Sequence, residues 1–158
     1  RPQKVHTLIV SGATVKLDFL TPSIPAKVQR MKEQSIRAWA ASTMGDRLGT
    51  GLAPEAVEWW IDLMGEAPKD SVLGVYRMLP AVDITAELPK ITAPTLVMTS
   101  TNSGYYGTSS EFANWQQNVP DSELVLIPGD SYHISASYPD ACAREAAAFL
   151  RRRAGKHA

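Results

Sequence analysis

One histidine in this chain occupies a setting typical of a general base. His133 follows a short apolar segment, residues 123–127, after a loop that contains Gly129. A strand that ends in such a loop and leads into a helix, here near Pro139, is where one class of enzymes holds a proton-accepting imidazole. The Gly-x-Ser-x-Gly pattern of a nucleophilic serine does not occur in the 158 residues. We therefore expect the nucleophile that His133 would serve to lie on another polypeptide.

The composition is that of an ordinary globular domain without a strong charge bias. Hydrophobic residues make up 44% and charged residues 20%, and 16 basic residues balance 16 acidic ones. This balance argues against nucleic acid or an anionic membrane as the main partner. No apolar run approaches the roughly 18 residues that span a bilayer, and the N-terminal residues lack the apolar core of a signal peptide.

The cysteine and histidine residues indicate neither a disulfide nor a metal site. Cys142 is the one cysteine, so no disulfide can form within the chain, which is typical of a cytoplasmic protein. His6, His133 and His157 share no spacing that suggests metal ligands. We expect neither a metal nor an organic cofactor.

Three apolar segments predict the strands of a parallel sheet. They are residues 5–10, 94–98 and 123–127. Helical segments separate them, and strand, helix and strand at these lengths favour parallel pairing with right-handed crossovers. In such sheets the loops after the strands line the ligand crevice. Three loops qualify: the one after Val10, residues 99–107 and residues 128–138.

A block of helices interrupts the strands and predicts a lid over that crevice. Apolar spacing and proline or glycine boundaries predict helices over residues 25–44, 54–64 and 69–79, the first ending at Gly45. We therefore assign residues 21–80 to a helical cap and residues 1–20 and 81–158 to the sheet-containing core.

Two more helices are expected after the second strand. Residues 108–111 have the spacing of a capping box, followed by an apolar face that ends at Val119. The last helix runs from about Pro139 to Arg153. Its predicted buried face consists of Cys142, Ala146, Phe149 and Leu150.

The order of these segments resembles the C-terminal half of an α/β-hydrolase. Residues 88–97 read LPKITAPTLV, residues 119–129 read VPDSELVLIPG, and His133 follows. In that family the first phrase leads into the penultimate strand and the second leads through the last strand to the catalytic histidine. The ordered pair behind a helical cap is more specific than either phrase alone. The resemblance covers most of the chain and implies an α/β fold with an inserted cap.

The resemblance implies that His133 is the catalytic histidine, but the acid that should orient it is replaced. The family's acid position falls on Ser103, with Asn102 beside it, and neither carries a charge. A neutral partner can hold one imidazole tautomer but stabilises an imidazolium poorly. Asp18, after the first strand, stays open as an alternative. Asp130 is another, although an Asp in a Gly-Asp-Ser turn typically bonds its own backbone.

The resemblance also implies a missing front half. The family's early strands, oxyanion-hole loop and nucleophile elbow precede the strand at residues 5–10. We expect a tightly bound N-terminal polypeptide that carries Gly-x-Ser-x-Gly, arising by proteolytic processing or from a split gene, with truncation as a further possibility. Without it, residues 5–10 and 94–98 would leave unpaired sheet edges and apolar faces, which tend to aggregate.

Aromatic residues supply the candidates for substrate contact. Trp59 and Trp60 cannot both face one side of a helix, so Trp60 is expected to reach the crevice, although packing within the cap would also explain it. Tyr105 lies in a loop that should border the crevice. These side chains favour a small apolar acyl substrate.

Three functions follow from this pattern. The first is a serine-type hydrolase of ester, lactone, thioester or similar acyl bonds, active only with the complementary portion. The second is a degenerate hydrolase fold that has lost catalysis and binds a ligand or protein, which the neutral residues Asn102 and Ser103 favour. The third is an acyltransferase on the same fold.

Overall fold

The computed structural model describes residues 4–102 and 114–154. Its centre is a parallel sheet in the order β1-β2-β3. The strands are β1 (Leu8–Ser11), β2 (Thr95–Ser100) and β3 (Ser122–Ile127). The predicted parallel sheet is therefore confirmed. β2 lies between the other two, so the expectation that residues 94–98 leave an open edge is wrong.

The first strand differs from its prediction. It begins at Leu8 rather than Val5, and Val5 and His6 are exposed. Leu8, Ile9 and Val10 are only half-buried, whereas five of the six residues of β2 are buried. The physical reason is that β1 pairs with β2 alone in the described part of the chain, so one edge of β1 has no strand beside it.

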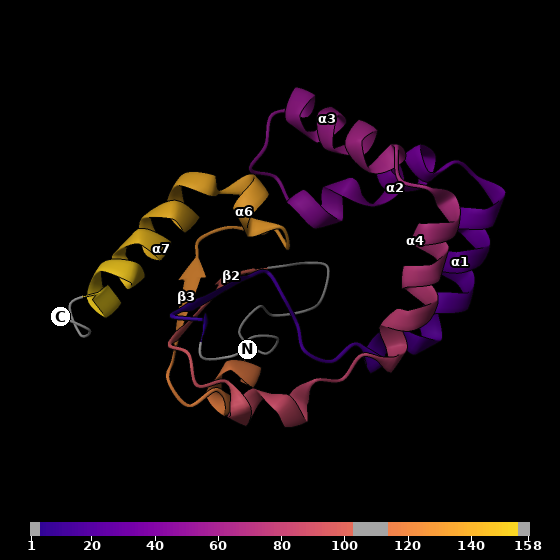
Figure 1. The fold of residues 1–158 in the computed structure, drawn as a ribbon. Coiled ribbons are helices and arrows are strands. Elements are labelled where there is room, and N and C mark those ends of the chain that lie inside the picture. The colour runs from indigo at the N-terminus through magenta and orange to yellow at the C-terminus, as the bar shows by residue number, and fades with distance from the viewer. Residues whose placement is uncertain (1–3, 103–113, 155–158) are drawn as a thin grey trace.

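Four α-helices stand between β1 and β2 in the chain and lie together on one side of the molecule (Figure 1). They are α1 (Ile24–Glu33), α2 (Ile36–Leu48), α3 (Pro54–Gly65) and α4 (Lys69–Met78). Their inward side chains form a core of their own, with Met31, Met44 and Leu48 almost fully buried. The helices match the predicted cap, whose exact boundaries at residues 21 and 80 stay a prediction.

The single helix predicted over residues 25–44 is in fact two helices. The backbone becomes extended at Gln34, which ends the first helix. Ser35 caps the second, because its hydroxyl accepts a hydrogen bond from the backbone amide of Ala38 at 3.0 Å. Gly45 is not a helix end either, since α2 continues to Leu48. The residue that ends it is Gly49, whose φ of 64° suits a residue without a side chain.

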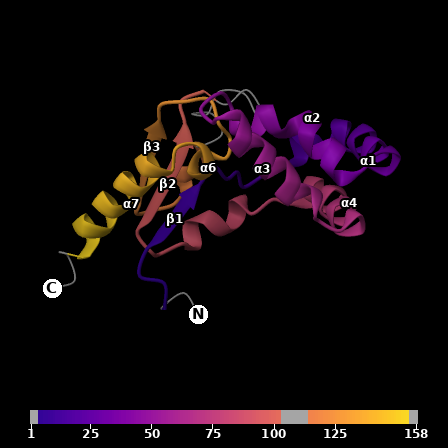
Figure 2. The same ribbon diagram turned by 90° about the horizontal axis from the view of Figure 1, so that it is seen from above.

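After β3 the chain forms α6 (Ile134–Ser137) and α7 (Pro139–Ala154). α7 lies against the sheet (Figure 2), and its Cys142 and Phe149 pack with Leu96 and Met98 of β2. The predicted burial of Leu150 is wrong, because its side chain is 44% exposed. Position 150 falls beyond the stripe that the sheet covers.

The remaining described elements are short 3-10 helices. They are η2 (Asp18–Ser23), η3 (Leu79–Ala81), η4 (Thr85–Lys90) and η5 (Asn114–Asn118). The capping box predicted at residues 108–111 lies outside the described residues. The part of that expected helix that is described, η5, is a 3-10 helix, and Val119 directly after it is buried.

Candidate active site

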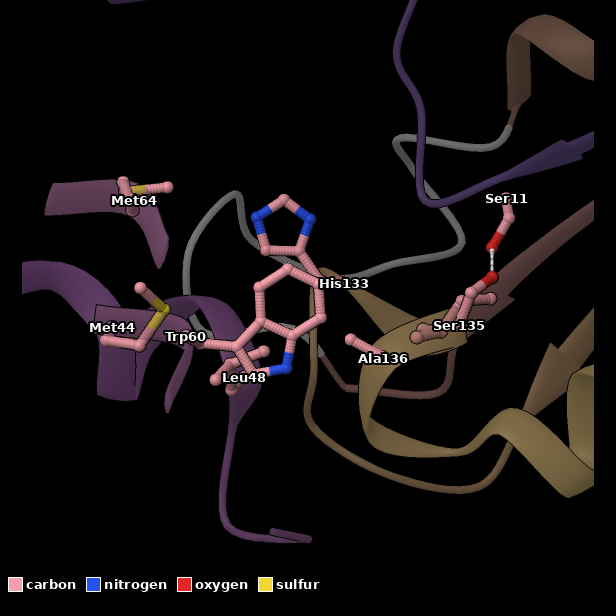
Figure 3. A pocket seen from close by; sticks show the side chains of 9 residues that line it. Ser11, Met44, Leu48, Trp60, Met64, His133, Ser135 and Ala136 are labelled. Carbon is pink, nitrogen blue, oxygen red and sulfur yellow. Dashed lines mark hydrogen bonds between the residues drawn. The ribbon is translucent and has the colours of Figure 1, made fainter. Parts of the chain in front are cut away.

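His133 lines a cavity of about 280 Å³ where the cap meets the ends of the strands. Figure 3 shows its imidazole among apolar side chains of α2 and α3. These are Met44, Leu48, Trp60 and Met64. On the other side lie Ser11, at the end of β1, and Ser135 of α6, with their hydroxyl oxygens 2.5 Å apart. The cavity is thus an apolar slot with one imidazole and one pair of hydroxyls.

Backbone hydrogen bonds to the cap fix the position of His133. The amides of Tyr132 and His133 donate to the carbonyl oxygen of Arg47 at 2.9 and 3.1 Å, and the hydroxyl of Ser131 donates to the same oxygen at 3.1 Å. The His133 carbonyl in turn accepts from the amide of Ala136 at 2.9 Å and so starts α6. The histidine loop is therefore attached to the last turn of α2, where helix carbonyls need partners.

The loop after β1 packs tightly against the histidine loop. Gly12 has a φ of 59°, and its amide donates to the carbonyl of Met98 at 3.0 Å. A Cβ at this position would overlap the carbonyl oxygen of Tyr132. Glycine is therefore required for two reasons, its left-handed backbone and the close approach of the neighbouring loop.

The environment of His133 favours the neutral ring. Burial lowers the pKa of its imidazole below the ordinary value of 6.5, and the positive charge of Arg47 lowers it further. The ring of Tyr132 stands edge-on to it with centroids 4.9 Å apart. An imidazole that stays unprotonated at neutral pH can accept a proton from a hydroxyl group.

The group that would orient the imidazole is not found among the described residues. Ser103, at the predicted acid position, lies outside them. Asn102 is exposed, and its backbone amide donates to the carbonyl of Gly129 at 2.9 Å. Asp18 pairs with Lys16 at 3.1 Å on the surface. Within residues 4–102 and 114–154, no side chain makes a hydrogen bond to the His133 ring.

Asp130 holds the cap to the core. Its carboxylate accepts hydrogen bonds from the amide and hydroxyl of Thr50, at 3.1 and 2.9 Å, and from the hydroxyl of Tyr138 at 2.9 Å. The hydrogen bond from the backbone N–H of Thr50 keeps the pKa of this carboxyl below its ordinary value of 3.8. The expectation that Asp130 mainly bonds its own turn missed these partners, because Thr50 is 80 positions away in the sequence.

Of the two predicted substrate-contact residues, the structure places one at the cavity. Trp60 lines the cavity, whereas its neighbour Trp59 is 57% exposed on the outer side of α3. The two rings meet edge-on with centroids 5.0 Å apart. Tyr105 lies outside the described residues, so its predicted role is untested.

Sequence reasoning missed the contributions of Arg47, Gly12 and the Ser11–Ser135 pair. A backbone carbonyl such as that of Arg47 leaves no mark in the sequence. Gly12 carries a usable signal, since a glycine directly after a strand often marks a close backbone approach. Over the described residues no group of three or more His, Cys, Asp and Glu could hold a metal ion, and no helix is long and apolar enough to cross a membrane.

Comparison with known proteins yields structural matches only. No protein-family profile and no curated protein matches the sequence. Among solved structures, a thermophilic esterase from Thermogutta terrifontis has a TM-score of 0.80 at 18% identity, with 96% of this chain and 58% of that chain covered. An α/β hydrolase enzyme, MGS-M2, from a deep-sea metagenome library of the Medee basin has 0.72 at 18%, covering 94% and 57%. The enol-lactonase from Burkholderia xenovorans LB400 has 0.77 at 15%, covering 92% and 56%.

These matches show the fold. The chain has the α/β-hydrolase fold over 56 to 58% of the length of those three structures. The segments it contains, a helical cap and the last strands of a parallel sheet, are those expected of the C-terminal part of the fold. The predicted fold class is confirmed, and the resemblance is confirmed as a likeness of fold.

Proposed function

We propose that this chain is the C-terminal part of a serine-type hydrolase of acyl bonds, to which it contributes the catalytic histidine and the lid. The observation that carries the proposal is the place of His133, whose imidazole lines an apolar cavity between the cap and the ends of the strands. The lowered pKa of that ring suits a general base. The fold shared with an esterase and an enol-lactonase supports the same reaction class.

The nucleophile belongs to a complementary N-terminal polypeptide that carries Gly-x-Ser-x-Gly. The half-buried β1 supports this part of the proposal, because it pairs only with β2 among the described residues. A parallel strand added at its edge would satisfy its backbone groups and cover Leu8 and Val10. The same addition would bring the end of a new strand next to Ser11 and the cavity.

Acylation of the serine and hydrolysis of the acyl-enzyme each proceed through two proton transfers. The serine hydroxyl gives its proton to the unprotonated nitrogen of His133 while its oxygen attacks the acyl carbon. The imidazolium returns that proton to the leaving group as the acyl bond breaks, and water repeats the sequence to release the acid. Backbone N–H groups of the complementary polypeptide hold the oxyanion. Met44, Leu48 and Trp60 surround the apolar part of a small acyl substrate.

Labelling by a fluorophosphonate probe tests the proposal directly. The probe should label a serine of the complementary polypeptide in the intact complex, and His133→Ala should reduce labelling and ester hydrolysis by about 10⁴-fold or more. The matched control is His6→Ala, which changes an exposed histidine before β1 and should leave both unchanged. Equal activity of the two variants would refute the catalytic role of His133.

The mass of the native protein tests the complementary polypeptide separately. We expect a stable complex whose mass exceeds that of this chain, with a co-purifying component that contains Gly-x-Ser-x-Gly. An active sample with the mass of this chain alone would refute this part.

A cytoplasmic location also belongs to the proposal, on the grounds that the single cysteine, Cys142, is buried and unpaired.

One observation favours a second candidate, a binding module without catalysis. Among the described residues no carboxylate hydrogen-bonds the His133 ring, and the predicted acid position holds Ser103. A hydrolase that has lost its acid would keep the cavity and bind a ligand there. In that case the intact complex would show no labelling by the serine probe, and His133→Ala would alter ligand affinity only.

A further inference from the structure

The cap holds a second cavity next to the one that contains His133. It has a volume of about 350 Å³. Its walls combine aromatic rings, aliphatic side chains and one cation, chiefly Trp39, Arg47, Val72, Tyr76, Leu79 and Tyr132. Met64 lines both cavities, and Tyr132 in the second adjoins His133 in the first. The two spaces are therefore neighbours, and the flexible side chain of Met64 borders both.

The cation in this cavity is built into the cap. Arg47 is only 9% exposed. Its guanidinium donates to the hydroxyl of Tyr76 at 3.0 Å and to that of Thr43 at 3.3 Å, and it stands over the ring of Trp39 at 5.1 Å from the centroid. Trp39 and Tyr76 also pack edge-on, with centroids 5.4 Å apart. The Trp39 ring and the hydroxyl groups of Tyr76 and Thr43 therefore fix the orientation of the guanidinium.

We infer that this second cavity is a subsite for a carboxylate carried by the acyl substrate, with Arg47 as its cationic partner. A planar guanidinium can bind a carboxylate through two parallel hydrogen bonds. Burial of a carboxylate is unfavourable unless such a partner is present. The Tyr76 hydroxyl stands beside the guanidinium as a second hydrogen-bonding group, and the aliphatic walls suit the methylene chain that would join the carboxylate to the acyl carbon.

This inference rests on the proposed hydrolysis and narrows its substrate. The acyl carbon would lie by His133 in the first cavity, and a short chain passing Met64 would place the distal carboxylate at Arg47. Such a substrate is a monoester of a dicarboxylic acid, or a lactone that carries a free carboxylate on its acyl chain. Neutral esters of the same length would forgo the ionic contact, so the protein should prefer the anionic form.

A pair of matched esters tests the preference in the active protein. The first is mono-4-nitrophenyl glutarate, and the second is the same compound with its free carboxylate capped as a methyl ester. We expect kcat/KM to be about 10- to 100-fold higher for the anionic ester, as hydrogen bonds between charged groups allow. A wild-type ratio of 1 or below overturns the inference, and that comparison requires no variant.

Variants then assign the preference to Arg47. Arg47→Gln should bring the ratio of the two kcat/KM values close to 1, and Arg47→Lys should keep part of it. The ratio is used because the charge of Arg47 also acts on His133 and affects both esters alike. The control is Arg37→Gln, in the same helix, where the arginine pairs with Glu58 and Asp62 on the surface. An unchanged ratio in Arg47→Gln would assign the preference elsewhere and overturn the subsite.

A binding measurement separates failure of the subsite from failure of the proposed function. If neither ester is hydrolysed, the hydrolase proposal fails, and the wild-type protein is titrated with monomethyl glutarate and dimethyl glutarate. Quenching of tryptophan fluorescence by the monoester alone would support the carboxylate subsite, since Trp39 and Trp60 line the two cavities. Equal responses to both compounds, or none, would overturn it.

Discussion

The cap and the sheet reach stability in different ways. The cap encloses its own core, in which Met31, Ala40, Met44 and Leu48 are 0 to 1% exposed. The sheet is covered by α7 on one face, and its first strand is half-buried with one edge unpaired among the described residues. The difference shows which region can position groups by itself and which offers a surface for a further polypeptide. The histidine loop lies where the two regions meet.

The largest expected effect concerns the covered face of the sheet. Phe149 is 0% exposed between α7 and β2, so Phe149→Ala should lower the free energy of unfolding by about 3 to 5 kcal/mol. Leu150→Ala, one position along the same helix, removes an exposed side chain and should cost less than about 1 kcal/mol. Denaturant titration of both variants measures the difference. Similar losses of unfolding free energy in the two variants would mean that α7 does not pack on the sheet through Phe149.

Substitution of two glycines by alanine should change the stability of the protein in opposite directions. At Gly12 an added Cβ meets the Tyr132 carbonyl and the φ is positive, so Gly12→Ala should cost about 1 to 3 kcal/mol and displace the histidine loop. Gly74, in the exposed part of α4, has nothing within 4 Å of a Cβ, so Gly74→Ala should stabilise the cap by about 0.5 to 1 kcal/mol. Thermal unfolding of both variants measures the two signs. A stabilising Gly12→Ala would contradict the close approach of the two loops.

The contact between cap and core should be weakened by a single change of charge. Asp130→Asn keeps the size of the side chain but loses the charge that strengthens its bonds to Thr50 and Tyr138, and should cost about 1 kcal/mol. Amide hydrogen exchange should accelerate at Thr50. The control is Asp46→Asn, an exposed residue near the same junction, which should leave exchange there unchanged. Identical exchange rates in the two variants would show that Asp130 does not stabilise the contact between cap and core.

The smallest effect is the pH dependence that His133 contributes. Its folded-state pKa is below the ordinary 6.5 because of burial and the charge of Arg47. As pH falls, the unfolded chain therefore takes up the proton first. The contribution of His133 to the free energy of unfolding is complete above about pH 6.5. It declines as pH falls through that value toward the folded-state pKa. Unfolding free energies between pH 8 and 5 for the wild type and His133→Gln should converge at the lower pH, and parallel curves would contradict the assignment.

Much of the fold could be predicted because its signals are local. Pro54 at the start of α3, the apolar run of β2 and the apolar spacing of α7 each lie within one segment. The break before α2 was missed because Ser35 fits a helical stripe as well as it fits a cap. The exposure of Leu150 was missed because periodicity gives the direction of a face but not its width.

The candidate site was predictable in part only. The strand and glycine loop before His133 drew attention to that residue, and the adjacent tryptophans drew attention to Trp60. Nothing local indicated the carbonyl of Arg47 that holds the histidine loop, or the approach of Gly12 to Tyr132. The acid position at Ser103 and the loop residue Tyr105 lie outside the described residues, so those predictions stand as they were made.

The sequence by itself determined the parallel strands, the helical block between them and the histidine at the end of the last strand, because periodicity, proline and glycine act over a few residues. Only the tertiary structure decided what surrounds that histidine. The contacts concerned join Arg47 to Tyr132, Thr50 to Asp130 and Ser11 to Ser135. Each connects parts of the chain about 80 or more positions apart, and such pairs meet only when the cap folds back onto the sheet.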